Sequence, residues 1–284
     1  MRSIKTIHTA ESRPIGDLKT VSPIPTASIQ QIDPFLFLNH HGPQVYPQNN
    51  HGLPFGPHPH RGMETVTFII QGDIAHKDSN GGESVINAGG VQWMTAGSGL
   101  IHAEVSSEKF LKDGGDLEIL QLWVNLPAKH KMTPPKYKGL QKDDIPLILS
   151  EDEKTKVNLT SGEYLGVKGA IETLNNIFLC TIEMQPEGIF TLDIPVENNI
   201  FCYIISGKVN VNGTSVPLFK LIEFNQDDEK LEIKAEEESI VLFGHAKPFN
   251  EPVVARGPFV MNSNEEIQEA YNDYYAGKLG SWSE

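Results

Sequence analysis

Cysteines, basic residues and long apolar runs are all scarce in this sequence of 284 residues. Two cysteines, Cys180 and Cys202, exclude a disulfide scaffold. The 23 Lys+Arg against 37 Asp+Glu give a net charge of −14, which argues against nucleic-acid binding as the main function because phosphate contacts need clustered basic residues. No apolar run approaches the roughly 18–20 residues of a membrane span, and the N-terminal segment lacks a secretory signal pattern. These absences predict a soluble, acidic, cytoplasmic protein.

Long amphipathic helical patterns are also nearly absent, which leaves strands as the main element. Gly (25) and Pro (19) are scattered along the chain, as expected for many short strands joined by turns. Runs rich in β-branched and aromatic residues predict strands at 65–70, 118–125, 177–184, 200–205 and 239–243. The sequence therefore predicts an all-β protein.

One helix is expected at the C-terminal end. Ser263 and Glu266 have the spacing of a capping box, and Ile267 and Ala270 begin an apolar face with helical spacing. Gly277 supplies a stop signal. We expect this helix to pack on a sheet face.

The chain is expected to contain two β units. The polar, proline-containing stretch 127–152 indicates a linker or an excursion between them. Segment 69–74 (IIQGDI) is echoed by 204–209 (IISGKV), where a strand, a glycine and a second strand follow each other in both halves. The echo hints at duplication, although strand-turn patterns of this kind are common.

Histidines supply the informative cluster, with seven of ten between positions 40 and 102. His58 and His60 are two residues apart, so on a strand they project from one face, and Glu64 has the same parity. His102 and Glu104 also project together. A lone His-x-His is more often a hydrogen-bonded surface pair, but two such pairs facing each other predict a first-row divalent metal site.

The same window resembles a pair of cupin motifs and, more specifically, the pirin family. The resemblance rests on 57–67 (PHPHRGMETVT), 76–79 (HKDS), 91–104 (VQWMTAGSGLIHAE), 250–253 (NEPV) and 257–262 (GPFVMN). It implies two tandem cupin barrels, with a metal-binding barrel at 1–135 and a metal-free barrel plus the C-terminal helix at 136–284. After His102 only His130 and His245 remain, too few for a second three-histidine site.

The resemblance also implies the ligand set of the first barrel. In pirins the ligands correspond to His58, His60, His102 and Glu104. General cupins use the glutamate of the first motif, here Glu64, which we expect instead to orient a ligand or an arginine such as Arg61. The implied metal is Fe(II), and other first-row ions also suit such a donor set.

The resemblance favours a quercetin 2,3-dioxygenase type of activity on flavonols or related aromatics with O₂. Glu104 would then be the catalytic base that takes the substrate proton. The alternative is a redox-sensitive regulatory protein that acts through a transcription factor or a metabolic enzyme. A third hypothesis, a storage or isomerase cupin, needs a polar pocket. Four neighbouring apolar residues instead predict an apolar pocket: Phe55, Phe68, Trp93 and Met94.

Other residues of the window have more ordinary interpretations. His40 and His41 are expected near the metal pocket on the basis of the resemblance alone. His76 is expected to stabilise a turn, with a place at the pocket mouth as the alternative. Cys180 and Cys202 lie in apolar strands and are predicted to be buried, inert thiols.

Overall fold

The computed structural model describes residues 1–282. Strands hold 54% of the residues and helices 9%, which confirms the all-β prediction. The chain forms two compact units. We call Ser12–Val21, Phe35–Asp143 and Phe249–Glu284 the N-barrel, and Met1–Glu11, Ser22–Pro34 and Asp144–Pro248 the C-barrel.

This division differs from the expected boundary between residues 135 and 136. The first residues of the chain belong to the C-barrel. The segment that begins at Phe249, which includes the C-terminal helix, belongs to the N-barrel. Strand pairing decides the assignment: β1 (Ile4–Thr9) is hydrogen-bonded to β22 (Lys220–Phe224), more than 200 residues away. Local hydrophobic patterns identify strands but carry no information about such distant partners.

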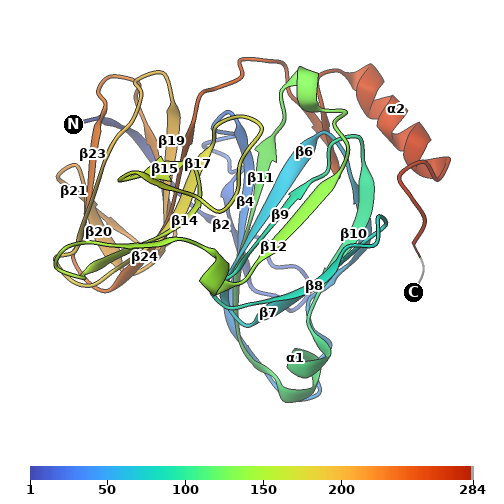
Figure 1. Ribbon diagram of the computed structural model, residues 1–284, viewed down its shortest axis with the longest axis horizontal. Coiled ribbons are helices and arrows are strands. Elements are labelled where there is room, and N and C mark those ends of the chain that lie inside the picture. The colour runs from blue at the N-terminus through green and yellow to red at the C-terminus, as the bar shows by residue number, and fades with distance from the viewer. Residues whose placement is uncertain (283–284) are drawn as a thin grey trace. The chain divides into compact units, whose positions relative to one another are not determined.

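The N-barrel consists of two antiparallel sheets whose facing sides share a core (Figure 1). The larger sheet has the order β12-β9-β6-β11-β4-β3-β2, and the smaller has β5-β10-β7-β8. Ile69 and Ile119 of the larger sheet and Ile74 and Ile86 of the smaller belong to one buried cluster. The strands are β2 (Glu11–Ser12), β3 (Thr20–Ile24), β4 (Phe35–Tyr46), β5 (Phe55–His60), β6 (Met63–Gln71), β7 (Asp73–Asp78), β8 (Glu83–Asn87), β9 (Val91–Thr95), β10 (Leu100–Val105), β11 (Gly115–Asn125) and β12 (Lys136–Leu140).

The C-barrel repeats this plan. Its sheets have the orders β1-β22-β19-β24-β17-β14-β13 and β18-β23-β20-β21. Their shared core includes Ile182 and Phe243 from one sheet and Val209 and Ile233 from the other. The further strands are β13 (Leu147–Leu149), β14 (Thr155–Ser161), β15 (Glu163–Tyr164), β16 (Val167–Lys168), β17 (Phe178–Met184), β18 (Ile189–Asp193), β19 (Asn199–Ser206), β20 (Lys208–Val211), β21 (Thr214–Pro217), β23 (Lys230–Ala235) and β24 (Ser239–Ala246).

The sequence echo corresponds to matching turns in the two barrels. Gly72 joins β6 to β7 with φ of 84°, and Gly207 joins β19 to β20 with φ of 76°. Only glycine adopts this backbone region without strain, which explains why both turns carry it. The two cysteines lie in the core of the C-barrel, where burial raises the pKa of each thiol, so the prediction of buried thiols is confirmed.

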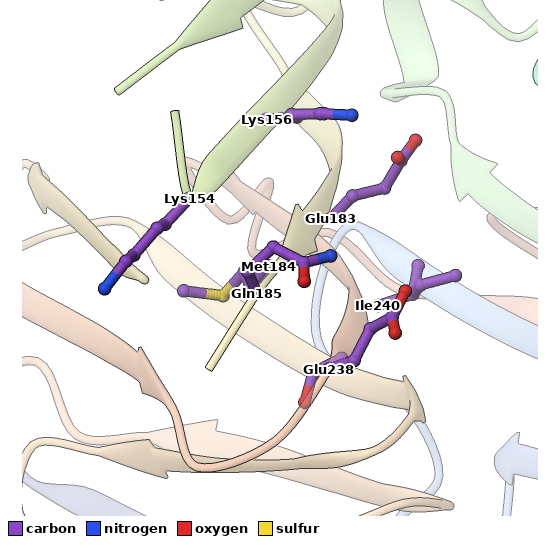
Figure 2. A pocket seen from close by; sticks show the side chains of 8 residues that line it. Lys154, Lys156, Glu183, Met184, Gln185, Glu238 and Ile240 are labelled. Atoms are coloured by element: carbon purple, nitrogen blue, oxygen red, sulfur yellow. The ribbon is translucent and has the colours of Figure 1, made fainter. Parts of the chain in front are cut away.

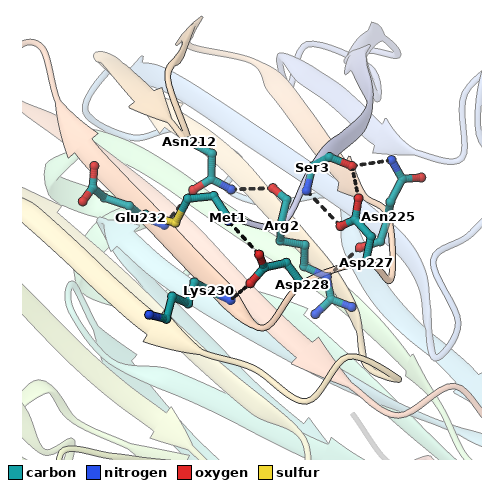
Figure 3. Close-up of polar contacts among 9 residues, drawn as sticks. All are labelled: Met1, Arg2, Ser3, Asn212, Asn225, Asp227, Asp228, Lys230 and Glu232. Carbon is teal, nitrogen blue, oxygen red and sulfur yellow. Dashed lines mark hydrogen bonds and ion pairs between the residues drawn. The ribbon is translucent and has the colours of Figure 1, made fainter.

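The first strand of the chain is anchored in the C-barrel through its preceding residues (Figure 3). The buried Arg2 guanidinium donates hydrogen bonds to the carbonyls of Asn225 at 2.6 Å and Asn198 at 2.9 Å. The Ser3 amide donates to Asp227 at 3.0 Å, and the Asn212 side chain donates to the Arg2 carbonyl at 2.6 Å. Burial lowers the pKa of Arg2, and these carbonyl acceptors compensate the buried charge.

The predicted C-terminal helix is present as α2 (Asn264–Tyr275). Both bonds of the capping box form: Ser263 Oγ accepts from the Glu266 amide, and Glu266 accepts from the Ser263 amide. Helix α2 packs on the hairpin of β25 (Val254–Arg256) and β26 (Phe259–Met261). The other helical segments are α1 (Glu108–Asp113) and two 3₁₀ turns, Ala128–His130 and Lys142–Asp144. Among residues 1–282, no helix combines the length and the apolar character needed to cross a membrane.

Candidate metal centre

Strand pairing in the smaller sheet of the N-barrel brings three histidines together. β5 and β10 are antiparallel, with His58 directly opposite His102, and His60 is two residues further along β5. The ligand nitrogens of the three side chains all lie within 4.8 Å of one another. His60 and His102 are buried, whereas His58 is half-buried. The paired spacing in the sequence therefore correctly placed these three imidazoles around one point.

Backbone carbonyls fix the orientation of two of the rings. His58 Nδ1 donates to the Gly56 carbonyl at 2.7 Å, and His60 Nδ1 donates to the Pro258 carbonyl at 3.1 Å. Since a carbonyl can only accept, the proton of each neutral ring is on Nδ1. The Nε2 lone pairs of both rings are thereby left available as ligands.

The environment keeps the three imidazoles neutral. Burial, with a smaller contribution from the neighbouring His58, lowers the pKa of His60 to about 3. Burial also lowers the pKa of His58, and it lowers that of His102 well below the usual value. Metal ligation requires neutral imidazole, so the ligand state is already the dominant one.

The spacing of the donor atoms fits a first-row metal ion. His102 Nε2 lies 3.0 Å from His58 Nε2, and the buried His60 Nε2 has no hydrogen-bond partner. Two nitrogens about 2.1 Å from one ion and about 90° apart would be separated by about 3.0 Å. A shared ion would satisfy all three lone pairs at once, so the donor set fits the divalent metal that the sequence predicts.

Glu104, the fourth expected ligand, lies on the same strand as His102 but is not in the group of donor atoms within 4.8 Å of one another, which holds the three histidines alone among the described residues. It lies two residues beyond His102 on the same face of β10 and is opposite His76 on β7. Its Oε1 accepts from Thr67 Oγ1 at 2.9 Å, and its Oε2 accepts from the Gln121 amide at 2.5 Å. Burial raises the pKa of Glu104 to about 7, against the effect of these two donors. A nearby cation would therefore be needed to hold this carboxylate fully ionised at neutral pH.

Glu64 does not belong to the histidine group. A turn at Arg61 and Gly62 separates β5 from β6, so residue parity cannot be counted from His60 to Glu64. Glu64 instead pairs with Thr95 of β9, whose hydroxyl donates to it at 2.6 Å. Arg61 donates to the Ser98 carbonyl and to Asp273, so the expected contact between Glu64 and Arg61 is not among its hydrogen bonds.

The neighbouring histidines have different surroundings. His76 bonds Asp78 at 2.9 Å and stacks on Tyr137, with ring centroids 3.8 Å apart, and its ring lies 5.5 Å from that of His102. It is therefore part of the wall around the triad. His41 bonds Thr20 and packs against Phe55.

His40 projects from the opposite side of β4 from its neighbour His41, because successive strand residues alternate in direction. It bonds Glu118 at 2.9 Å. The ligand group of the described residues contains neither His40 nor His41.

The interior beside Glu104 is more polar than predicted. Register places Gln121, Thr67 and Gln92 in one row across β11, β6 and β9. Trp93 and Phe68 have the opposite parity to Gln92 and Thr67, so they project from the other face of the sheet. The prediction that Phe68 and Trp93 line the pocket is therefore wrong. Met94, another of the four apolar residues expected there, lies on the interior face opposite Thr65.

The segment after residue 248 completes this end of the N-barrel. Pro258 orients His60, and Asp273 of α2 bonds the buried Arg61 at 3.0 Å. The buried Lys131 ammonium donates to the carbonyls of Gly62 and Val260, each at 2.9 Å. In the sequence, segment 257–262 stands out only as part of a resemblance, because a contribution through a backbone carbonyl leaves no side-chain signal.

A small hollow in the C-barrel offers no comparable chemistry (Figure 2). Its volume is about 140 Å³, below the roughly 300–1,000 Å³ of typical small-molecule pockets. The side chains around it come from β14, β17 and β24 and their flanking turns, and they are Lys154, Lys156, Glu183, Met184, Gln185, Glu238, Ser239 and Ile240. None of them is a histidine or a cysteine, and we assign this hollow no role.

Two β-barrels in one chain, one of them with a buried histidine triad, define a bicupin. The family model named Pirin matches residues 17–124, and the model of the Pirin C-terminal cupin domain matches residues 179–280. The chain belongs to the pirin family.

Similar proteins agree with this assignment. A Pseudomonas aeruginosa protein, named as a candidate quercetin 2,3-dioxygenase, is 37% identical over 88% of this chain and 87% of its own length. The crystal structure of a quercetin 2,3-dioxygenase from Acinetobacter baumannii has a TM-score of 0.92 and 35% identity, and covers 99% of both chains. The Escherichia coli pirin YhhW, solved in complex with nickel(II), shares the fold at 20% identity with a TM-score of 0.66, over 86% of this chain and 99% of its own.

Proposed function

We propose that this pirin is a metal-dependent dioxygenase of the quercetin 2,3-dioxygenase type, which acts on flavonols or related aromatics with O₂. The names of the Pseudomonas and Acinetobacter relatives support the reaction class. The nickel complex of the Escherichia coli pirin supports a divalent ion in such a fold. We assign Fe(II) as the metal, with His58, His60, His102 and Glu104 as its ligands.

One observation carries this proposal: three imidazoles converge on one point, two of them are buried, and the Nε2 of His60 has no hydrogen-bond partner. Two of the three Nε2 atoms are 3.0 Å apart. A hydrogen-bonded surface pair, the alternative for a His-x-His motif, does not require burial of the third histidine. His102 is fully buried.

The bound metal would supply a Lewis acid that favours the ionised form of a substrate hydroxyl. Glu104 takes the proton from that hydroxyl. Beside the bound cation this carboxylate is held ionised, which is the form that can accept a proton. Thr67 and Gln121 hold the two carboxylate oxygens in place, so the base keeps its orientation while the substrate enters. The half-buried His58 marks the side from which the substrate approaches.

The test is turnover of quercetin by iron-loaded protein under O₂, followed as loss of flavonol absorbance. His58→Ala should lose at least a hundredfold in rate because the metal loses a ligand, whereas the exposed His51→Ala should match the wild type. Metal content is measured in parallel. Iron-loaded wild-type protein that shows no more turnover than His58→Ala would contradict the dioxygenase and favour a metal-binding regulatory protein that acts through a protein partner.

A further inference from the structure

The described structure leaves one buried amide in the N-barrel without hydrogen bonds. Gln92, the second residue of β9, is 2% exposed. Neither its Nε2 nor its Oε1 has a partner. Buried polar groups are nearly always hydrogen-bonded, and an unsatisfied one lowers stability. A fully unsatisfied amide therefore requires an explanation.

The position of Gln92 relates it to the candidate metal centre. It is directly opposite Thr67 on β6, and Thr67 is opposite Gln121 on β11. Directly opposed strand residues project from the same face with Cβ atoms about 4.5–5.5 Å apart. Thr67 and Gln121 both donate to Glu104. Gln92 therefore continues the row of side chains that faces the proposed catalytic carboxylate.

The neighbours of Gln92 leave it without a hydrogen bond. Thr67 donates its hydroxyl proton to Glu104, so it could only accept from Gln92, and no such bond is present. On the other side, β12 places Gly139 opposite Gln92, and glycine has no side chain to offer. The amide is left with one acceptor and a pair of N–H donors on the interior side of the sheet.

We propose that Gln92 binds the substrate of the metal centre, donating from Nε2 to a ring carbonyl and accepting at Oε1 from a hydroxyl group. This inference rests on the proposed function and narrows its substrate class. The site would select aromatic molecules with a carbonyl beside a hydroxyl, as in flavonols, over ring systems that lack the carbonyl. A site built for a hydrogen bond discriminates strongly against the ligand that cannot form it, because its own polar group is then left unpaired.

The first experiment compares stability without metal or substrate. Gln92→Met keeps the length of the side chain and removes both unsatisfied polar atoms, so the melting temperature of the metal-free protein should rise by about 2–4 °C. A purely structural glutamine would give the opposite result, a fall in melting temperature. That fall would overturn the proposal, and the measurement does not depend on activity.

The second experiment measures ligand binding by metal-loaded protein without O₂, with quercetin and with catechin, which lacks the ring carbonyl. Gln92→Met should bind quercetin at least tenfold more weakly than the wild type and lose less affinity for catechin, which keeps only the hydroxyl partner of Oε1, at equal metal content. Equal losses for the two ligands, or no loss for either, would overturn the role of Gln92 while the wild-type data still support the proposed function. A wild-type protein that binds no quercetin would overturn both.

Discussion

Burial sets the protonation state of individual histidines in the N-barrel, and His41 shows the effect outside the group of His58, His60 and His102. Its side chain is 3% exposed and bonds Thr20 at 2.9 Å. Burial, with a smaller contribution from the neighbouring His40, lowers its pKa to about 3. In the unfolded chain the same ring would titrate near 6.5.

The stability of the protein should therefore depend on pH through His41. Between pH 6.5 and pH 3 the unfolded state binds a proton that the folded state does not, so the free energy of unfolding falls as the pH is lowered. The loss attributable to one such group approaches about 1.4 kcal/mol per pH unit. His41→Asn keeps a polar partner for Thr20 but does not titrate, so urea unfolding between pH 7 and pH 4 should show a shallower decline for this variant. Parallel declines would exclude His41 as a source of the pH dependence.

At the residue scale, the sequence predicted the histidines of the site better than the residues around them. The spacing of His58, His60 and His102 is specific because few other patterns place three imidazoles on paired strands. Thr67 and Gln92 carried no such signal. A polar residue in a strand becomes informative only when the facing strand and the register are known.

The turn between β5 and β6 explains why Glu64 does not share a face with His58 and His60, as residue parity along one strand would predict. Gly62 has a φ of 81° and ends the alternation that begins at His58. Its amide donates to the Gly97 carbonyl at 2.8 Å. A Cβ atom at this position would be 2.0 Å from the Val260 carbonyl oxygen. Only glycine allows the strand carrying His60 to turn so close to another part of the backbone.

Replacement of this glycine should damage the site itself. Gly62→Ala should lower the free energy of unfolding by more than about 3 kcal/mol, because backbone displacement adds to the cost of the left-handed conformation. Gly81→Ala is the matched control, since it has a φ of 88° with no atom within 4 Å, and should cost only about 1 kcal/mol. The measurements are chemical denaturation and metal content. Equal effects of the two substitutions would show that the contact with Val260 is unimportant.

On the scale of the whole molecule, the sequence predicts two β-barrels but not that each barrel is built from three separate segments of the chain. The proline-containing stretch near 127–152 does contain the change from one barrel to the other, at Asp143 and Asp144. The N-terminal segment lies in the C-barrel and the C-terminal segment in the N-barrel. This was not predictable, because each segment pairs or packs with residues more than 150 positions away. The β1–β22 pair and the Pro258–His60 bond are both of this kind.

A chain that ends at Pro248 tests this division. It keeps His58, His60, His102 and Glu104 but loses the carbonyl that orients His60 and the carboxylate that bonds Arg61. We expect it to lose metal binding by at least tenfold, measured by elemental analysis after dialysis. Cys180 and Cys202, both in the C-barrel, should remain unreactive towards a thiol reagent. Full metal retention, or rapid thiol labelling, would contradict the assignment of the final segment to the N-barrel.

The bond between His60 and the Pro258 carbonyl also has a consequence for biosynthesis. A ribosome releases the chain from the N-terminal end, and early domains generally fold first. Here the proposed ligands are all made within the first 104 residues, yet the group that orients one of them is made 198 residues after it. The site can therefore reach the orientation seen here only after Pro258 has been synthesised and has folded back onto His60.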